Sequence, residues 1–273
     1  MVELIVLGSG TPNPDPHRAG SSVAVADGSS WVLVDCGRAA TQRALDAGLD
    51  LTALRAVLIT HHHSDHLSDL ATLAITRWTA GAGGPLLVVA PHGPTAEFAS
   101  RCLAVFADDS FRGQAAPAAG RRPAIAVDAF TAGDDIVEVL GLDGWTVHSV
   151  AVHHHPVEPA VGYRVERNGV AVVISGDTAV CDGMHRLADG AHLVVHEALL
   201  SAAVHPALLE GNASARSVGE LARHTRPRTV VLTHLIPAPR TTADEDAFVA
   251  EARGGGFTGR IVVAHDLLRL EAG

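Results

Sequence analysis

Four histidines and an aspartate fall within six consecutive positions of the stretch LITHHHSDH, directly after an apolar run. His61, His63 and Asp65 alternate along the chain, so in an extended segment their side chains point to the same side. His66 begins a predicted helix and can turn back toward them. Neutral imidazole is the commonest metal ligand in proteins, and carboxylate oxygen beside it suits zinc. We interpret this stretch as half of a metal site rather than as a polar surface loop.

Three further groups of ligand-type residues follow predicted strands later in the chain. VHHHPVEPAVGYR carries a histidine triplet at 153–155, VVISGDTAVCD places Asp177 in a tight turn, and VVLTHLIPAP places His234 at a strand end. Each group is weak by itself, because polar residues at strand ends are often solvated or capping residues. Together with the first cluster they supply enough nitrogen and oxygen ligands for two metal ions, which Asp177 could bridge.

The elements that must position these residues are short Val/Ile/Leu-rich runs that alternate with helical stretches. Strands are predicted over 3–8, 22–26, 31–35, 56–60, 86–90, 145–152, 161–165, 170–175, 192–196, 229–233 and 260–264. Helices are predicted over 39–47, 67–79, 94–107, 179–188, 214–225 and 243–253. The Ala-, Gly-, Pro- and Asp-rich stretch 108–135 is predicted to be a loop or lid. Ligand sites gather where strands of helix-flanked sheets end, so we expect the site at one edge of two sheets.

Composition narrows the class of protein. The chain has 273 residues, of which 47% are hydrophobic, and this is typical of a globular protein with a sizeable core. No apolar stretch reaches the roughly 18 residues that span a bilayer. The N-terminal MVELIVLGSGTP lacks the positive charge of a signal peptide, so we expect a cytoplasmic protein without a membrane partner. The formal net charge of −10 disfavours a nucleic-acid partner, because such proteins usually carry a basic surplus.

The cysteine residues indicate neither disulfide bonds nor a cysteine-ligated metal. Cys36, Cys102 and Cys181 are widely spaced and form neither a disulfide framework nor a cysteine-rich zinc pattern. We expect three reduced thiols.

The motifs resemble those of the metallo-β-lactamase superfamily of dinuclear metal hydrolases. THHHSDH fits HxHxDH, and SGDT and LTHLIP are similar to the family's later motifs. The resemblance runs from LGSGTPNPDPHRAGSS and LVDCGRAATQRAL to GRIVVAHDLLRL, and it is closest to the ribonuclease Z-like branch, where GTP, DCG, PxxGYR, GDT and HEA recur. It implies an α/β (layered α+β) fold: a four-layer αββα sandwich of two mixed sheets flanked by helices, forming a single domain over residues 1–273. A homodimer is common in this family.

The resemblance also implies a ligand set. It assigns the first metal ion to His61, His63 and one histidine of the triplet, and the second to Asp65, His66 and His234. Asp177 would bridge the two ions. Counting back from Gly162 selects His154 from the triplet, with His153 in the place of the family's aspartate. Zinc is the expected metal, and manganese or iron is compatible with a carboxylate-bridged set.

Two ions about 3.5–4 Å apart lower the pKa of a shared water and stabilise charge on the attacking and leaving oxygens. Asp65 is expected to orient that water as well as bind metal, so it is the predicted catalytic residue. Residues expected to hydrogen-bond the ligands without binding metal are Asp35, His153, His196 and Glu197. For Asp35 and Glu197, a capping or purely structural role is an equal alternative.

The match to ribonuclease Z itself is incomplete. Bacterial members of that family carry a projecting arm for the tRNA elbow between the third-histidine motif and GDT, whereas Asp177 follows His154 by only 23 positions. Asn212, in GNASARS, stands where the family has a further catalytic histidine, and an amide cannot donate a proton as an imidazolium can. We therefore predict a hydrolase of a small or medium ester, with a phosphodiester favoured. The alternatives are tRNA 3′ endonuclease, lactonase and a non-catalytic metal-binding protein of the same fold.

The pocket walls decide which bond is cleaved. We expect them to come from 76–80, 92–115 and the LIPAPR loop. The candidate substrate contacts there are Trp78, Phe106, Phe111 and Arg240. For Trp78 and Phe106 a place in the core is the stronger expectation, because both are apolar residues at helical spacing.

Overall fold

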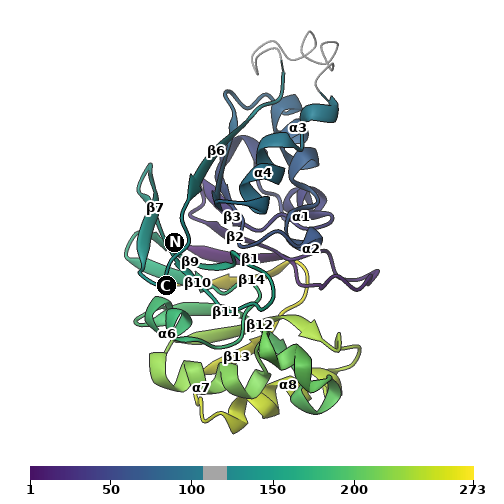
Figure 1. Cartoon of the computed structure of the whole chain (residues 1–273), viewed down its shortest axis with the longest axis vertical. Helices are drawn as coiled ribbons and strands as arrows, with labels where there is room; N and C mark the ends of the chain where they lie inside the picture. Colours follow the sequence, from purple (N-terminus) through teal and green to yellow (C-terminus); the bar gives the residue numbers. More distant parts are fainter. Residues whose placement is uncertain (107–121) are drawn as a thin grey trace.

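The computed structural model describes residues 1–106 and 122–273 (Figure 1). Two seven-stranded sheets are present in this described part of the chain. The first sheet contains β1 (Glu3–Gly8), β2 (Ser22–Ala26), β3 (Trp31–Val34), β4 (Leu54–Leu58), β5 (Leu86–Pro91), β6 (Ile125–Phe130) and β14 (Leu268–Glu271). The second sheet contains β7 (Val137–Leu142), β8 (Trp145–Ala151), β9 (Val161–Arg167), β10 (Val170–Ile174), β11 (Leu193–Leu199), β12 (Thr229–Ile236) and β13 (Arg260–Val263).

Helices cover the outer faces of both sheets (Figure 1). The α-helices are α1 (Ala40–Asp46), α2 (Ser64–Leu67), α3 (Leu70–Thr79), α4 (Pro94–Arg101), α6 (Asp182–Ala188), α7 (Ala215–Thr225) and α8 (Thr242–Gly254). Short 3₁₀ turns lie at Leu51–Ala53, Ala104–Phe106, Ser201–Ala203 and Pro206–Glu210.

Each sheet joins an antiparallel half to a parallel half. The first sheet has the order β14-β1-β2-β3-β4-β5-β6, antiparallel from β14 to β3 and parallel from β3 to β6. The second has the order β13-β12-β11-β10-β9-β8-β7, antiparallel from β7 to β10 and parallel from β10 to β13. In the second sheet β8, β10 and β12 therefore run in the same direction and end at the same edge.

Side-chain alternation decides which face of each strand meets which layer. In β1, Leu4 and Val6 pack between the two sheets, whereas Ile5 and Leu7 pack against the helices outside. Successive side chains of a strand point to opposite faces, so a strand covered on both sides is apolar throughout. The sequence shows this as uninterrupted Val/Ile/Leu runs. The observed layers confirm the predicted fold of two mixed sheets flanked by helices.

Three strands were not predicted. Residues 125–130 form β6, so the prediction of a loop over 108–135 is wrong for that part, while 108–121 lies outside the described residues. β7 and β14 were missed as well. All three are edge strands, and partly exposed edge strands lack the continuous apolar run that marks a buried one.

One predicted helix is divided. The stretch 67–79 begins earlier, as α2, and resumes as α3 after a break at Asp69. The backbone N–H of Asp69 donates to the carbonyl of Cys36 at 3.0 Å, and its carboxylate accepts from the N–H of Thr41 at 2.7 Å. These bonds tie the break to the chain that follows β3, which holds α2 against that loop.

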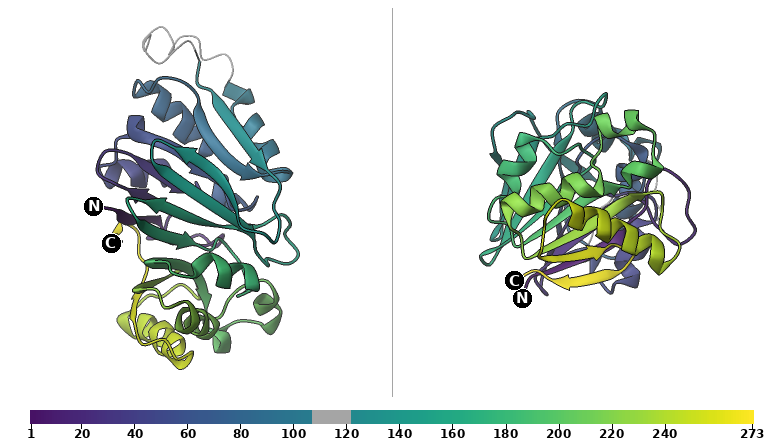
Figure 2. Two further views of the ribbon diagram at one scale, coloured as in Figure 1. Left: turned by 90° about the vertical axis from the view of Figure 1, so that its left-hand side faces the viewer. Right: turned by 90° about the horizontal axis from the view of Figure 1, so that it is seen from below.

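The chain termini lie side by side (Figure 2), because β1 pairs with β14. No helix in the described ranges is long and apolar enough to cross a membrane. A single domain over 1–273, a cytoplasmic location and a homodimer stay predictions.

A partly buried ion pair links the two sheets. Asp27, after β2, lies 2.6 Å from the Arg167 guanidinium at the end of β9, which in turn stacks 4.9 Å from the centre of the Trp145 ring. Asp27 also accepts hydrogen bonds from the backbone N–H groups of Ser29 and Ser30. Burial opposes ionisation, but these bonds outweigh it and hold the pKa of Asp27 well below its usual range.

We expect Asp27→Asn to lower the free energy of unfolding by about 1–3 kcal/mol at neutral pH, because it removes a charge-assisted hydrogen bond. The folded-state pKa is depressed, so this contribution is fully present above the unfolded pKa of about 4 and is lost as the pH falls below it. Thermal melts of the variant and the wild type should therefore converge in acid. A melting-temperature difference that stays constant down to pH 2 would contradict this assignment. Asp189→Asn, at an exposed position, is the control.

Candidate metal centre

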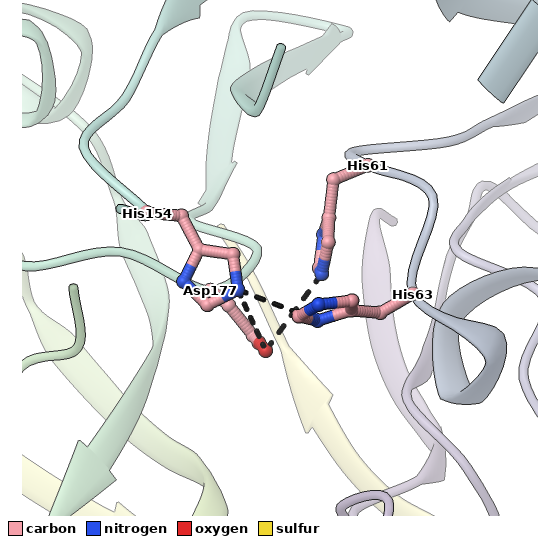
Figure 3. A group of neighbouring side chains, drawn as sticks. All are labelled: His61, His63, His154 and Asp177. Carbon is pink, nitrogen blue, oxygen red and sulfur yellow. Dashed lines mark hydrogen bonds and ion pairs between the residues drawn. The ribbon is translucent and has the colours of Figure 1, made fainter. Parts of the chain in front are cut away.

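Four side chains from the two sheets meet at the common strand edge (Figure 3). His61 and His63 follow β4, His154 follows β8, and Asp177 follows β10. One ligand-type atom of each lies within 4.8 Å of those of the others. Figure 3 shows the three imidazole rings and the carboxylate directed at one point. We refer to these four residues as the first ligand group.

A second ligand group adjoins the first and consists of Asp65, His66 and His234. Nε2 of His234 lies 3.2 Å from Oδ2 of Asp65, and Nε2 of His66 lies 3.5 Å from the same oxygen. Asp177 stands between the groups: its Oδ1 is 3.3 Å from Nε2 of His66, and its Oδ2 is 3.5 Å from Nε2 of His234 and 3.9 Å from Nε2 of His61. The structure thus brings together all seven residues that the sequence singled out as candidate ligands.

The hydrogen-bonding state of these atoms fits a bound cation. Nε2 of His61, Nε2 of His66, Oδ1 of Asp65 and Oδ1 of Asp177 are buried and make no hydrogen bond within residues 1–106 and 122–273. A buried polar atom without a partner costs about 1–3 kcal/mol, and native structures avoid it. Metal ions at the two groups would satisfy Nε2 of His61, Nε2 of His66 and Oδ1 of Asp177, and a water between the ions would satisfy Oδ1 of Asp65; imidazole nitrogen and carboxylate oxygen are zinc-type donors. These clusters are therefore suited to binding metal.

Electrostatics at the centre also favour a cation. Burial lowers the pKa of His61 well below its usual value, so its ring is in the neutral form that binds metal. Burial opposes ionisation of Asp65 and Asp177, but contacts with His234 and His66 outweigh it and hold the pKa of both carboxyls below the usual range. Burial likewise opposes a charge on His66, but Asp177 and Asp35 outweigh it and raise its pKa well above the usual value. The ionised carboxylates are thus stabilised by nearby positive charge, which a proton or a metal ion can supply.

Hydrogen bonds on the far side of the rings set their orientation. Nδ1 of His66 lies 2.7 Å from Oδ2 of Asp35, and Nδ1 of His154 donates to the carbonyl of Gly211 at 2.9 Å. With Nδ1 engaged in this way, Nε2 of each ring faces the centre. Gly211 was missed by the sequence analysis, because a backbone carbonyl leaves no signal in the residue type.

A close approach of two backbones fixes α2 beside the centre. A Cβ at Gly37 would lie 1.9 Å from the carbonyl oxygen of Asp65, so no other residue fits there without movement. The N–H of Cys36 donates to the carbonyl of His66 at 2.6 Å. The glycine of the DCG motif therefore allows the turn that carries Asp65 and His66 to pack on the loop after β3.

Backbone conformation is unusual at two residues of the centre. Asp35 has φ of 60° and His234 has φ of 48°, in the left-handed region that non-glycine residues seldom adopt. Such conformations cost about 1–3 kcal/mol each and are retained where the surrounding structure imposes them. Asp35 follows β3 and contacts His66, whereas His234 lies inside β12, two residues before its end, and contacts Asp65.

The remaining predicted supporting residues have different surroundings. Glu197 is fully buried; one carboxylate oxygen accepts from the N–H of Thr178 and the other lies 4.0 Å from Nδ1 of His234. His196 is buried and its Nδ1 donates to the carbonyl of Glu197 at 2.8 Å. His153 is exposed, and only its main chain bonds to Thr178, so the structure does not bring its ring to the cluster.

The three described candidate substrate contacts, Trp78, Phe106 and Arg240, have different surroundings. Trp78 is only 3% exposed and belongs to the interior. Phe106 is 45% exposed, so the expectation that it belongs to the core is wrong. Arg240 pairs with Asp15 at 3.0 Å, and Phe111 lies outside the described residues.

Comparison with known proteins identifies the class. Residues 15–234 match the family described as the metallo-beta-lactamase superfamily, so the chain belongs to this superfamily of metal-dependent hydrolases. Over its full length it falls in the ribonuclease Z-like branch: it is 36% identical over 282 residues to ribonuclease Z of Mycobacterium bovis (strain BCG / Pasteur 1173P2), covering 99% of this chain and 98% of that protein.

Solved structures agree on the fold. The crystal structure of human tRNase Z, short form, superimposes with a TM-score of 0.76 at 20% identity and covers 99% of both chains. The metallo-beta-lactamase fold protein YhfI from Bacillus subtilis gives a TM-score of 0.77 at 20% identity and covers 98% of both chains.

Proposed function

We propose that this protein is a dinuclear metal-dependent phosphodiesterase that acts on a small or medium substrate. The observation that carries the proposal is the pair of adjoining buried ligand groups with Asp177 between them. In this proposal the first ion is held by His61, His63 and His154, the second by Asp65, His66 and His234, and Asp177 bridges them. Zinc is the proposed metal, because the donors are imidazole nitrogens and carboxylate oxygens.

When bound, two divalent ions activate water and stabilise negative charge on the phosphoryl oxygens. The protein's part is to fix the ligands and to take a proton. Oδ2 of Asp65 is held between His66 and His234, whereas its Oδ1 makes no hydrogen bond to any described residue. We propose that Oδ1 of Asp65 orients the attacking water and accepts its proton.

The chain between His154 and Asp177 supports a small substrate. Residues 161–174 are used by the β9–β10 hairpin, which leaves only 155–160 as a connecting loop and no length for a projecting arm. A cavity of about 840 Å³ flanks this loop beside the ligand groups; none of the seven candidate ligands lines it, and its charged lining is Asp134, Glu158 and Asp182 with a single Arg186. Carboxylates there would repel the phosphate backbone of an RNA, whereas a single phosphodiester carries little charge to repel.

A tRNA 3′ endonuclease is the second candidate, because the relatives at 36–38% identity are named ribonuclease Z. Asn212 argues against it, since this residue stands where the ribonuclease Z pattern has a histidine. Its Nδ2 donates to the carbonyl of Leu208 at 2.8 Å, so the amide is engaged in the turn before α7.

A panel of substrates separates the candidates. With zinc supplied, we expect the protein to hydrolyse bis(p-nitrophenyl) phosphate. Hydrolysis should stop when a chelator removes the metal and should recover when zinc is returned. We expect no cleavage of a precursor tRNA with a 3′ trailer at micromolar enzyme. Cutting at the tRNA 3′ end without hydrolysis of the chromogenic diester would reverse the ranking. Turnover of acyl lactones alone would favour a lactonase, and occupied metal sites without turnover of any ester would favour a non-catalytic protein.

A further inference from the structure

One hydroxyl group lies between the two ligand groups on the side away from the centre. Thr60 is completely buried and directly precedes His61. Its Oγ1 lies 3.0 Å from Nδ1 of His61 and 3.0 Å from each carboxylate oxygen of Asp35. Asp35 in turn lies 2.7 Å from Nδ1 of His66. A single buried carboxylate is therefore joined to one histidine of each ligand group, directly to His66 and through Thr60 to His61.

We propose that Thr60 is a positioning residue that couples the first ligand group to Asp35. One carboxylate then orients a histidine ligand of each metal ion, directly or through the Thr60 hydroxyl. The inference rests on the proposed metal centre. In this proposal the Thr60 hydroxyl orients His61, a ligand of the first ion, whereas Asp35 directly orients His66, a ligand of the second ion.

The direction of each hydrogen bond follows from the chemistry of the groups. Asp35 accepts from the Thr60 backbone N–H at 2.8 Å and faces Nδ1 of His66, so as a carboxylate it also accepts from the Thr60 hydroxyl. The single hydroxyl proton is then used, so Oγ1 can only accept from His61. This requires the proton of the neutral His61 ring to be on Nδ1, which leaves its buried Nε2 as a lone-pair donor to the centre.

The surroundings hold Thr60 in place. The N–H of Val161 donates to its carbonyl at 3.1 Å. A Cβ at Gly176 would lie 2.9 Å from the Cβ of Thr60, so the turn that carries Asp177 packs directly on it. Because the side chain is enclosed, a substitution that keeps its shape and removes only the hydroxyl isolates the hydrogen bonds. Thr60→Val is that substitution.

The test measures zinc affinity of each half separately, by competition with a chromophoric chelator. His234→Ala weakens the second group and leaves zinc on the first, whereas His63→Ala does the reverse. We expect Thr60→Val to weaken zinc binding about 10- to 100-fold in the His234→Ala background. In the His63→Ala background we expect a change of about twofold or less. Asp35→Asn should weaken binding in both, and Thr60→Ser should restore it. Thr95→Val is the matched control, because the Thr95 hydroxyl is buried and has no hydrogen bond among the described residues.

Each outcome decides something. An equal effect of Thr60→Val in the two backgrounds, or none, overturns the coupling role. If the valine variant does not fold by circular dichroism, Thr60→Ser against Thr60→Ala gives the same comparison, because the two differ by the hydroxyl alone. A wild-type protein that binds no zinc overturns the metal centre itself, whereas two tight sites unaffected by Thr60→Val overturn only this inference.

Discussion

Replacing Asp177 with alanine is expected to lower kcat/KM for bis(p-nitrophenyl) phosphate by about 10⁴-fold or more. Bound zinc is expected to fall from two ions to fewer than one per chain. Asp177 approaches both ligand groups: its Oδ1 lies 3.3 Å from Nε2 of His66, and its Oδ2 lies 3.5 Å from Nε2 of His234 and 3.9 Å from Nε2 of His61. Its removal would leave the remaining ligands without their shared anion and the two ions, if bound, without a bridge.

The measurement pairs steady-state kinetics with metal analysis of the same sample. Circular dichroism should be unchanged, because Asp177 lies in a turn after β10 and supplies no apolar packing. Asp189→Asn, an exposed carboxylate change after α6, is the matched control and should keep both zinc and activity. Retention of two zinc ions and of more than a tenth of the wild-type rate by Asp177→Ala would remove the bridging role and with it the dinuclear proposal.

Asp65→Asn is expected to lower kcat by about 10²- to 10⁴-fold, the range typical of a lost general base. The amide keeps the shape of the carboxylate but loses the charge that holds Nε2 of His234 and His66 at 3.2 and 3.5 Å. Zinc on the first ligand group should remain, because none of its members is changed. The loss should appear in kcat more than in KM, because the proton acceptor acts in the transition state and not in substrate binding.

Kinetics over a series of zinc concentrations test this assignment. If added zinc fills the second group of Asp65→Asn and the rate returns to the wild-type value, the residue is a ligand only and has no part in proton transfer. If two zinc ions are bound and kcat stays low, the proposed double role of Asp65 is supported.

Local patterns made much of this protein predictable. The buried strands repeat Val, Ile and Leu on both faces, so β1 to β5 and β8 to β13 are visible in the sequence. The alternation of His61 and His63 predicts that their side chains converge, because it is a property of an extended chain regardless of what surrounds it. The same argument is wrong for Asp65, which lies in α2 and joins the second ligand group. The edge strands β6, β7 and β14 were missed for the converse reason: they are defined by the neighbour they pair with and by little in their own residues.

The sequence by itself determined the residue types of the metal centre and the layered sheets that carry them, because both follow from short-range spacing. Only the tertiary structure decided the surroundings of each side chain. It left His153 exposed and directed His154 to the centre through the Gly211 carbonyl, and it joined Thr60 to Asp35 across 25 positions of sequence. These contacts join segments remote in the chain, and hydrogen bonds to main-chain atoms or across strands have no periodicity that a linear pattern can reveal.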